Sequence, residues 1–337
     1  MSSRTIGSSE STDKHSNGEK VGGLFRRILI CLCVAVAALV ALECILRFGL
    51  GLGNPVLVTP DAACDYVLKP NQNIYRFFAT TSTNRFGMRS PDFAAVRPQN
   101  TLRLMFVGDS LTYGTSRVDQ HGIFTDILRR DLPTIVRQPV EVLNVSAGNW
   151  AIDNELSFIR SRGIFQSNVV LLVVNDDDLK QPRANIAEFA RDMPVERPSS
   201  ALGELYTRYL QPFLSSRAAQ KQSTQLDQDA QTERNNLAEL DAFRSIVSTQ
   251  GAVFVLVFAP FVSDIPKESG EAESAFQDWA AAHQTPFLDL TADEASHDPG
   301  SITLDGMHLN ARGNMLVAQA IERSWQILVK SQLSIVR

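Results

Sequence analysis

One serine and one histidine in this sequence have neighbours that suit nucleophilic catalysis. Ser110 follows Gly108 and Asp109 in a short, turn-forming run, and His308 lies three residues after Asp305. A free serine hydroxyl is a poor nucleophile at neutral pH, so it requires a base within hydrogen-bonding reach and a third group that orients this base. At a spacing of three residues, one turn of chain can place the Asp305 carboxylate beside the His308 imidazole. The pattern predicts acyl transfer with Ser110 as nucleophile, His308 as base and Asp305 as orienting acid.

These side chains must be positioned by regular elements, and the sequence from residue 101 onward predicts them. Short apolar runs alternate with amphipathic stretches of helical length, which is typical of a parallel sheet covered by helices. The predicted strands are 102–107, 141–145, 168–174, 252–258 and 286–290, and the predicted helices are 122–131, 154–162, 233–250, 274–283 and 311–330. Ligands of open α/β sheets bind at the carboxyl ends of the strands. Ser110 comes directly after the first strand, so we expect it at this edge.

The segments around these residues resemble the first and last sequence blocks of the SGNH (GDSL-type) hydrolase superfamily. Residues 108–114 read Gly-Asp-Ser-Leu-Thr-Tyr-Gly, and residues 305–310 read Asp-Gly-Met-His-Leu-Asn. Each block alone is a modest signal, because Gly-Asp-Ser is often only a turn. Their order near the two ends of an α/β domain makes the resemblance specific. It covers residues 101–330 and also residues 84–89, which look like the segment preceding the domain in membrane-anchored members.

The second and third blocks of the superfamily are matched less completely. Gly148 follows the second predicted strand, as the glycine of the second block does. Asn175 and Asp176 match the end of the third block, Gly-x-Asn-Asp, but Val173 stands where the family has glycine. The resemblance implies an oxyanion hole formed by the backbone N–H groups of Ser110 and Gly148 and by the side-chain amide of Asn175. Such donors must converge where negative charge develops on the acyl oxygen.

The resemblance also implies the fold. We expect a flavodoxin-like three-layer α/β/α sandwich with a central parallel sheet, the SGNH hydrolase fold, preceded by one N-terminal transmembrane helix. The chain order Ser, Asp, His also occurs in α/β-hydrolases, but those enzymes have Gly-x-Ser-x-Gly around the nucleophile and an acid distant from the histidine. Neither feature is present here.

The N-terminal part contains a candidate membrane span. Residues 28–42 form an unbroken apolar run, which continues to Leu46 if Glu43 is allowed. As a helix, residues 28–46 span about 28 Å, close to the thickness of a bilayer core. A cleaved signal peptide would need a small-x-small site after the apolar run, and no suitable one is present. A lipoprotein site at Cys44 would need a small residue at position 43, where the sequence has Glu43. A buried soluble helix would have a polar face, which this run lacks. We therefore predict a transmembrane signal anchor.

Basic residues flank this run unequally. Arg47 stands at its end, and the next basic residue is Lys69. Before the run lie Lys14, Lys20, Arg26 and Arg27, in addition to Arg4 near the start of the chain. By the positive-inside rule, the N-terminus lies in the cytoplasm and the remainder lies outside. We expect a single-pass inner (plasma) membrane protein with a periplasmic or extracytoplasmic catalytic domain.

The remaining sequence predicts the domain boundaries. Residues 1–27 are rich in serine, glycine and charge and are expected to form a disordered cytoplasmic tail before the 28–46 span. Residues 47–100 contain five prolines spread through an irregular sequence and predict an extended connector. The hydrolase-like domain then covers residues 101–335. Within it, residues 178–233 interrupt the alternation of strands and helices, so we expect an insertion that caps or flanks the active site.

Charge and cysteine content limit the partners. The formal net charge is −5 and no basic stripe is visible, so a nucleic-acid partner is not predicted. Cys31, Cys33 and Cys44 lie in or beside the apolar run and only Cys64 lies beyond it, which predicts neither a disulfide framework nor a zinc site. Residues 176–178 are three aspartates that could attract a hard cation, but an acidic loop after a strand explains them more simply. We predict no metal and no organic cofactor.

Anchored members of the superfamily that face the cell exterior commonly act on O-acyl groups of polysaccharides or peptidoglycan. The resemblance therefore implies an extracytoplasmic serine esterase that deacylates a cell-envelope or exported polysaccharide, such as an exopolysaccharide, cellulose or peptidoglycan. Its expected partners are an acylated carbohydrate or other ester substrate, the membrane and the polysaccharide-synthesis machinery. Two alternatives stay open. One is an O-acyltransferase that uses the same acyl-serine intermediate, and the other is a non-catalytic component that binds or assembles polysaccharide.

Overall fold

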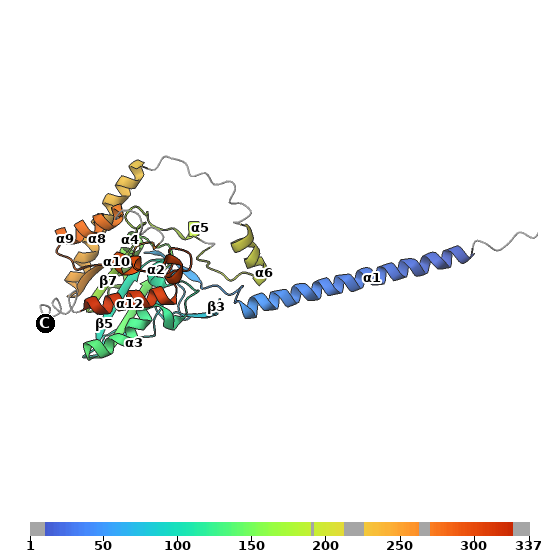
Figure 1. Cartoon of the computed structure of the whole chain (residues 1–337), viewed down its shortest axis with the longest axis horizontal. Helices are drawn as coiled ribbons and strands as arrows, with labels where there is room; N and C mark the ends of the chain where they lie inside the picture. Colours follow the sequence, from blue (N-terminus) through green and yellow to red (C-terminus); the bar gives the residue numbers. More distant parts are fainter. Residues whose placement is uncertain (1–10, 190–191, 212–225, 263–269, 326–337) are drawn as a thin grey trace, which may run out of the picture.

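The computed structural model describes residues 11–189, 192–211, 226–262 and 270–325. A five-stranded parallel sheet forms the centre of the domain (Figure 1). Its strands, in spatial order, are β6 (Val140–Ser146), β5 (Leu102–Gly108), β7 (Val169–Val174), β8 (Val253–Phe258) and β9 (Phe287–Asp289). The chain moves outward from β5 first to one side and then to the other, which creates a topological switch point at the carboxyl end of β5.

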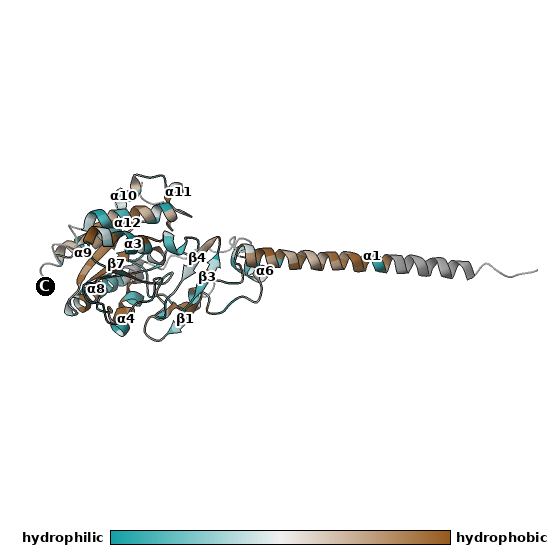
Figure 2. Ribbon diagram, turned by 90° about the horizontal axis from the view of Figure 1, so that it is seen from below, coloured by the Kyte–Doolittle hydropathy of each residue, from teal (hydrophilic) through white to brown (hydrophobic). Residues whose placement is uncertain are grey.

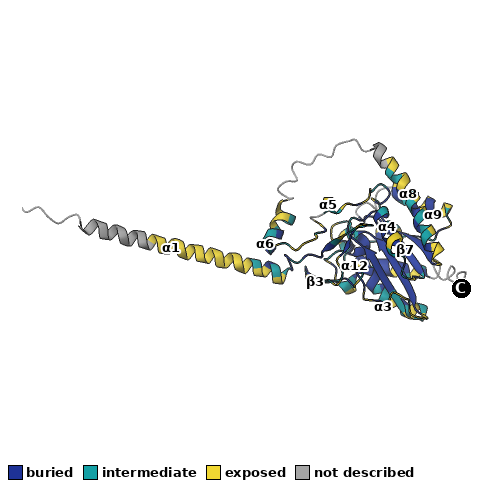
Figure 3. Ribbon diagram, turned by 180° about the vertical axis from the view of Figure 1, so that it is seen from behind, coloured by how far each residue is buried: buried dark blue, intermediate teal, exposed yellow. Residues whose placement is uncertain are grey.

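Helices cover both faces of this sheet. Successive strand residues point to opposite faces, so Met105 and Val107 contribute to one core while Leu104 and Phe106 contribute to the other. The first core is covered by α4 (Ile152–Arg162), α8 (Leu226–Thr249) and α9 (Glu271–Ala282), and the second by α3 (Phe124–Val136) and α12 (Ala311–Trp325). Figure 3 shows the sheet buried between these layers. The predicted three-layer α/β/α fold is confirmed.

All five predicted strands and all five predicted long helices are present, with ends shifted by a few residues. The last helix is described to Trp325, and the rest of its predicted range lies outside the described residues. Several short helices were not predicted, because one turn has no periodicity to detect: α2 (Ser110–Tyr113), η2 (Gln120–Gly122), α5 (Ile186–Phe189), α10 (Thr291–Ala295) and α11 (Pro299–Ile302). The aromatic stretch of residues 202–214 does predict a short helix, and α6 (Ala201–Glu204) and η3 (Leu205–Leu210) form it; residues 212–214 lie outside the described residues.

The segment predicted as an extended connector, residues 47–100, is more ordered than expected. Its middle part, residues 58–82, forms two antiparallel hairpins, β1 (Val58–Asp61) with β2 (Asp65–Leu68) and β3 (Asn73–Arg76) with β4 (Ala79–Ser82). Tyr66 and Ile74 bury their side chains in the main core. The hairpins form because these contacts with the distant α/β domain stabilise strands that are too short to be recognised alone.

The N-terminal helix is longer than the predicted span. α1 (Ser11–Cys44) continues into a π-helical turn, η1 (Ile45–Gly49), and its segment Leu24–Gly49 is long and apolar enough to cross a membrane. Figure 2 shows this hydrophobic part projecting from the domain. Residues 11–27, which we predicted to be a disordered tail, are helical because extending an existing helix adds a hydrogen bond for each residue fixed. Residues 1–10 lie outside the described residues.

One buried carboxyl should make stability depend on pH. Glu294 on α10 is buried, and neither carboxyl oxygen has a hydrogen-bond partner among the described residues. Burial raises the pKa of Glu294 to about 8, and the charges of Asp293, Asp176 and Asp289 add to the rise. In the unfolded chain this carboxyl should titrate near its ordinary pKa of 4.5. Its contribution to stability is therefore complete below pH 4.5 and is lost as the pH rises to about 8.

We expect Glu294→Gln to flatten this dependence, because glutamine resembles the protonated acid and cannot ionise. The variant should match the native protein near pH 4.5 and unfold at a higher temperature than it near pH 8. The measurement is the thermal unfolding midpoint of the full chain across this range. The control is Glu271→Gln, since the Glu271 side chain is exposed. Parallel curves for Glu294→Gln and the native protein would contradict the prediction.

Candidate active site

The loop after β5 presents Ser110 at the carboxyl edge of the sheet. Ser110 is the first residue of α2, and the Asp109 carboxylate caps this helix by accepting the Leu111 N–H at 2.9 Å. A Cβ atom on Gly108 would lie 2.2 Å from Thr112 Oγ1, so no larger residue fits here without a shift. The glycine therefore permits the sharp change from strand to helix that carries the serine.

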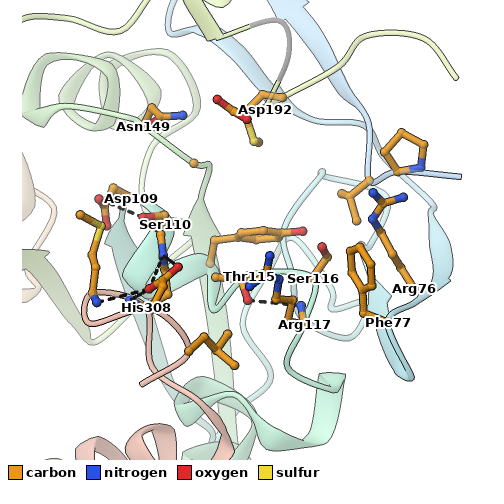
Figure 4. Close-up of a pocket in the computed structure, with 18 of the residues that line it drawn as sticks. Arg76, Phe77, Asp109, Ser110, Thr115, Ser116, Arg117, Asn149, Asp192 and His308 are labelled. Carbon is orange, nitrogen blue, oxygen red and sulfur yellow. Dashed lines mark hydrogen bonds and ion pairs between the residues drawn. The ribbon is translucent and has the colours of Figure 1, made fainter. Parts of the chain in front are cut away.

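The loop before α12 brings the other two predicted catalytic residues to Ser110. His308 Nε2 lies 3.1 Å from Ser110 Oγ, and His308 Nδ1 lies 3.0 Å from Asp305 Oδ2 (Figure 4). Asp305 also accepts the backbone N–H of His308 at 2.8 Å. A β-bridge between Thr303 and Leu309 closes this turn. Ser110, His308 and Asp305 thus form one hydrogen-bonded chain across 198 residues of sequence.

The charges and hydrogen bonds of Asp305 and His308 suit general-base catalysis by His308. Burial alone would raise the pKa of the Asp305 carboxyl, but hydrogen bonds from the His308 backbone and side chain outweigh it, so the pKa is lowered. Asp305 therefore stays ionised and keeps the imidazole proton on Nδ1. In the neutral imidazole Nε2 then carries no proton and can accept the Ser110 hydroxyl hydrogen.

Of the predicted oxyanion residues, Gly148 lines the pocket together with Ser110, whereas Asn175 lies behind Asp109. Gly148, after β6, lines the pocket beside Ser110, and its carbonyl accepts the Tyr66 hydroxyl at 2.6 Å. Asn175, directly after β7, is buried, and its Nδ2 donates to Asp109 Oδ2 at 3.2 Å. The Asn175 backbone N–H donates to Asp178 Oδ2 at 2.8 Å, which holds the residue in place. The structure therefore brings Asn175 to the nucleophile through Asp109, and its role as an oxyanion donor stays a prediction.

Asp109 is a site residue that we did not single out from the sequence. Its carboxyl contacts both the Asn175 amide and the Ser110 hydroxyl, the latter at 3.4 Å. Burial raises the pKa of Asp109, although the Leu111 N–H, the His308 charge and the Asn175 amide partly offset this rise. Its position inside the Gly-Asp-Ser motif was the available signal. We infer that Asp109 orients the Asn175 amide.

Removing the Asn175 amide tests the predicted oxyanion hole. We expect Asn175→Ala to lower kcat for ester hydrolysis by about 10²- to 10³-fold with little change in KM, because the donor acts on charge that develops in the transition state. Asn236→Ala is a matched control, since the Asn236 amide is also buried but donates to backbone carbonyls, including that of Asp178 at 2.8 Å. An equal loss of kcat in both variants would indicate a structural role only.

A pocket of about 450 Å³ opens at this site. Ser110 and His308 lie at one end, and Phe77 and Arg117 lie toward the other (Figure 4). The segment predicted as an insertion, residues 178–233, supplies part of the wall through Asp192, Met193, Arg208 and Tyr209. Part of this segment, residues 190–191 and 212–225, lies outside the described residues. The described part flanks the site, as expected.

Arg89 connects the segment of residues 84–89 to the loop that follows the nucleophile. Its guanidinium is buried and donates to the carbonyl oxygens of Tyr113, Thr115 and Val118 at 2.6 to 2.7 Å. Burial lowers the pKa of Arg89, but these carbonyl acceptors solvate the cation. Arg89 thereby fixes the loop that follows the nucleophile helix. Sequence alone indicated the segment but not this contact.

The acidic residues 176–178 make structural hydrogen bonds. Asp176 accepts the Phe261 N–H at 2.6 Å and so joins the loops after β7 and β8, while Asp178 accepts the Asn175 N–H. Within the described ranges, no three His, Cys, Asp or Glu side chains are grouped so that they could hold a metal ion. The run is therefore built as an acidic loop at a strand end.

No protein-family model matches the chain, and no curated protein matches it. Solved structures similar to it include the acetyl xylan esterase AlAXEase, with 17% identity and a TM-score of 0.44 over 68% of this chain and 100% of that one. The lipase/acylhydrolase from Enterococcus faecalis has 17% identity and a TM-score of 0.41 over 66% and 94%. TesA has 13% identity and a TM-score of 0.43 over 67% and 99%. At such identities and TM-scores, the likeness assigns neither an activity nor a substrate to this chain.

Proposed function

We propose that this protein is a serine esterase that removes O-acyl groups from a carbohydrate. The observation that carries the proposal is the hydrogen-bonded chain from Asp305 through His308 to Ser110 at the edge of a pocket. A serine in this arrangement is activated by an adjacent base whose orientation is fixed by a carboxylate. Ser110 lies at the carboxyl end of β5, and ligands of open α/β sheets bind at this edge.

The reaction has two acyl-transfer steps. Ser110 Oγ attacks the ester carbonyl carbon as its proton passes to His308 Nε2, and the tetrahedral intermediate collapses when His308 returns the proton to the departing sugar alkoxide. The product is an acyl ester on Ser110. Water then attacks this ester, gives its proton to His308, and the free acid leaves as Ser110 recovers its hydrogen. The N–H groups of Ser110 and Gly148, with the Asn175 amide, stabilise the negative oxygen in both steps.

We further propose that α1 anchors the enzyme in the inner (plasma) membrane with its N-terminus in the cytoplasm. The apolar length of Leu24–Gly49 supports the span, and the excess of basic residues before it supports the orientation. This places the pocket on the extracytoplasmic side, where acylated envelope and exported polysaccharides occur. A phosphatase fused after residue 60 should be active in cells, whereas activity of a cytoplasmic reporter there would contradict the topology.

The activity is tested by incubating the full chain, in detergent, with acetylated oligosaccharides and measuring released acetate against a Ser110→Ala blank. Release above the blank supports the esterase. No release, and no turnover of a p-nitrophenyl acyl ester, would overturn it in favour of a non-catalytic component. If acyl groups instead move to an added oligosaccharide without release of acid, the protein is an O-acyltransferase that uses the same serine.

A further inference from the structure

The end of the membrane helix is held firmly by the catalytic domain. Glu43 accepts the backbone N–H groups of Ala201 and Leu202 at 2.8 and 2.9 Å, at the start of α6. Arg47 donates to the same carboxylate, with its Nε 3.0 Å from Oε1. A carboxylate that binds the free N–H groups at a helix start makes charge-assisted hydrogen bonds. The helix end and α6 therefore move as one unit.

An apolar cluster completes this junction. Leu46, Leu52 and Ala201 are buried together, and Leu205 and Tyr209 of η3 pack against them. The turn between β3 and β4 joins the same junction, since the Phe77 N–H donates to the Leu50 carbonyl at 2.9 Å. Two separate segments of the domain, α6 with η3 and the turn between β3 and β4, thus contact the end of α1.

Large apolar side chains stand exposed around this junction. The side chains of Phe48 and Phe78 are each 75% exposed, Tyr206 is 55% exposed and Leu210 is 47% exposed. Tyr206 and Leu210 each come one residue after Leu205 and Tyr209, which face the cluster, so they point away from it around the helix. We call these four residues the lipid face. Figures 1 and 3 both show α6 and β3 at the end of the domain from which α1 leaves.

Exposed aromatic and apolar groups are costly in water when they gather in one place, and they are typical of surfaces that meet a membrane. Here they lie at the end of a helix apolar enough to span one, or next to the residues that contact this end. If α1 spans a bilayer, the contacts that hold its end against the domain bring these side chains close to the bilayer surface.

We propose that the lipid face rests in the interfacial region of the bilayer that α1 crosses and holds the pocket mouth at the membrane surface. This inference rests on the membrane anchor of the proposed function. The elements that carry the lipid face also line the pocket, through Phe77 beside Phe78 and through Arg208 and Tyr209 on η3. An acyl ester on a membrane-bound amphiphile would therefore reach Ser110 without leaving the bilayer surface.

The contact is tested on the full chain in nanodiscs of phosphatidylcholine and phosphatidylglycerol. Phe78→Trp adds a reporter to a protein whose native tryptophans, Trp150, Trp279 and Trp325, are buried. Lipids brominated on the acyl chain near the headgroup should quench the added emission. The control is Ile135→Trp near the end of α3, which is exposed but lies away from α1 (Figure 1). Quenching at residue 78 but not at 135 supports the proposal, and equal quenching or none overturns it.

A second measurement asks whether the contact serves catalysis. Phe78→Asn combined with Leu210→Gln removes apolar surface outside the pocket lining, and the left-handed backbone at Phe78, with φ +64°, suits asparagine. We expect kcat/KM for a long-chain ester embedded in the nanodisc to fall by about tenfold, while turnover of water-soluble p-nitrophenyl acetate is unchanged. An equal effect on both substrates, or none on either, overturns the proposal. Extraction of the native chain from cell membranes by alkaline carbonate would instead overturn the anchor itself.

Discussion

Replacing Ser110 by alanine should lower kcat for ester hydrolysis by about 10⁴- to 10⁶-fold, and His308→Ala should have an effect of similar size. Each change removes an essential partner in the same proton transfer, since His308 Nε2 lies 3.1 Å from Ser110 Oγ. Because the two residues act as a unit, we expect the double variant to be no slower than either single variant. The measurement is kcat for a p-nitrophenyl acyl ester.

The matched control for this prediction is Ser116→Ala, which removes a hydroxyl from the same pocket but not from the catalytic chain. It should keep kcat close to that of the native protein. If the losses of kcat in the two single variants added up in the double variant, Ser110 and His308 would act independently. That result would contradict a shared proton transfer between them. A small loss in Ser110→Ala would reject the acyl-serine mechanism.

Glu204→Ala should lower the stability of the domain by about 3–5 kcal/mol. Arg76 and Glu204 are each 2% exposed, and Arg76 Nη1 lies 3.2 Å from Glu204 Oε2. Glu204 also accepts the Gly53 N–H at 2.5 Å, and Arg76 donates to the Tyr209 hydroxyl at 3.0 Å. Removing the carboxylate leaves the guanidinium buried without its countercharge, and this desolvated cation is the source of the loss.

Thermal unfolding of the full chain measures this effect, and a loss of this size corresponds to a midpoint lower by about 10 °C. Glu271→Ala is the control, because the Lys180–Glu271 pair is exposed and such pairs contribute at most about 1 kcal/mol. Replacing Arg76 by Met together with Glu204→Leu should recover part of the loss, since no charge is then left buried. If Glu204→Ala behaves like Glu271→Ala, the buried pair does not stabilise this junction.

The pair also connects the segment after the N-terminal helix to the pocket. The loss of the pair therefore has a second consequence. Arg76 and Tyr209 line the pocket, whereas Gly53 lies just after the N-terminal apolar helix. Glu204→Ala should therefore loosen the pocket wall as well as the junction. A form of the chain that begins at Gly53 would lack Glu43 and Leu46, so it is a less suitable test protein than the full chain.

The strands and long helices followed from the sequence because apolar spacing is a local property. Val169 and Val253 begin uninterrupted β-rich runs, and a strand buried on both faces favours such a run. The membrane span is local for the same reason, since length and apolar character alone indicate it. The short hairpins between residues 58 and 82 were missed because their stability comes from packing on a core formed later in the chain.

The sequence by itself determined the candidate nucleophile, base and acid, because Ser110, His308 and Asp305 occur in short motifs whose residue types are tied to one chemistry. Only the tertiary structure decided how they meet and what surrounds them. Arg89 supports the nucleophile loop, Asp109 engages Asn175, and the Arg76–Glu204 pair ties the anchor to the pocket wall across 128 residues. Contacts between residues so far apart leave no periodic or compositional pattern in the sequence. An arginine or an aspartate can occur in many structural positions, and only the fold determines which partner it is buried beside.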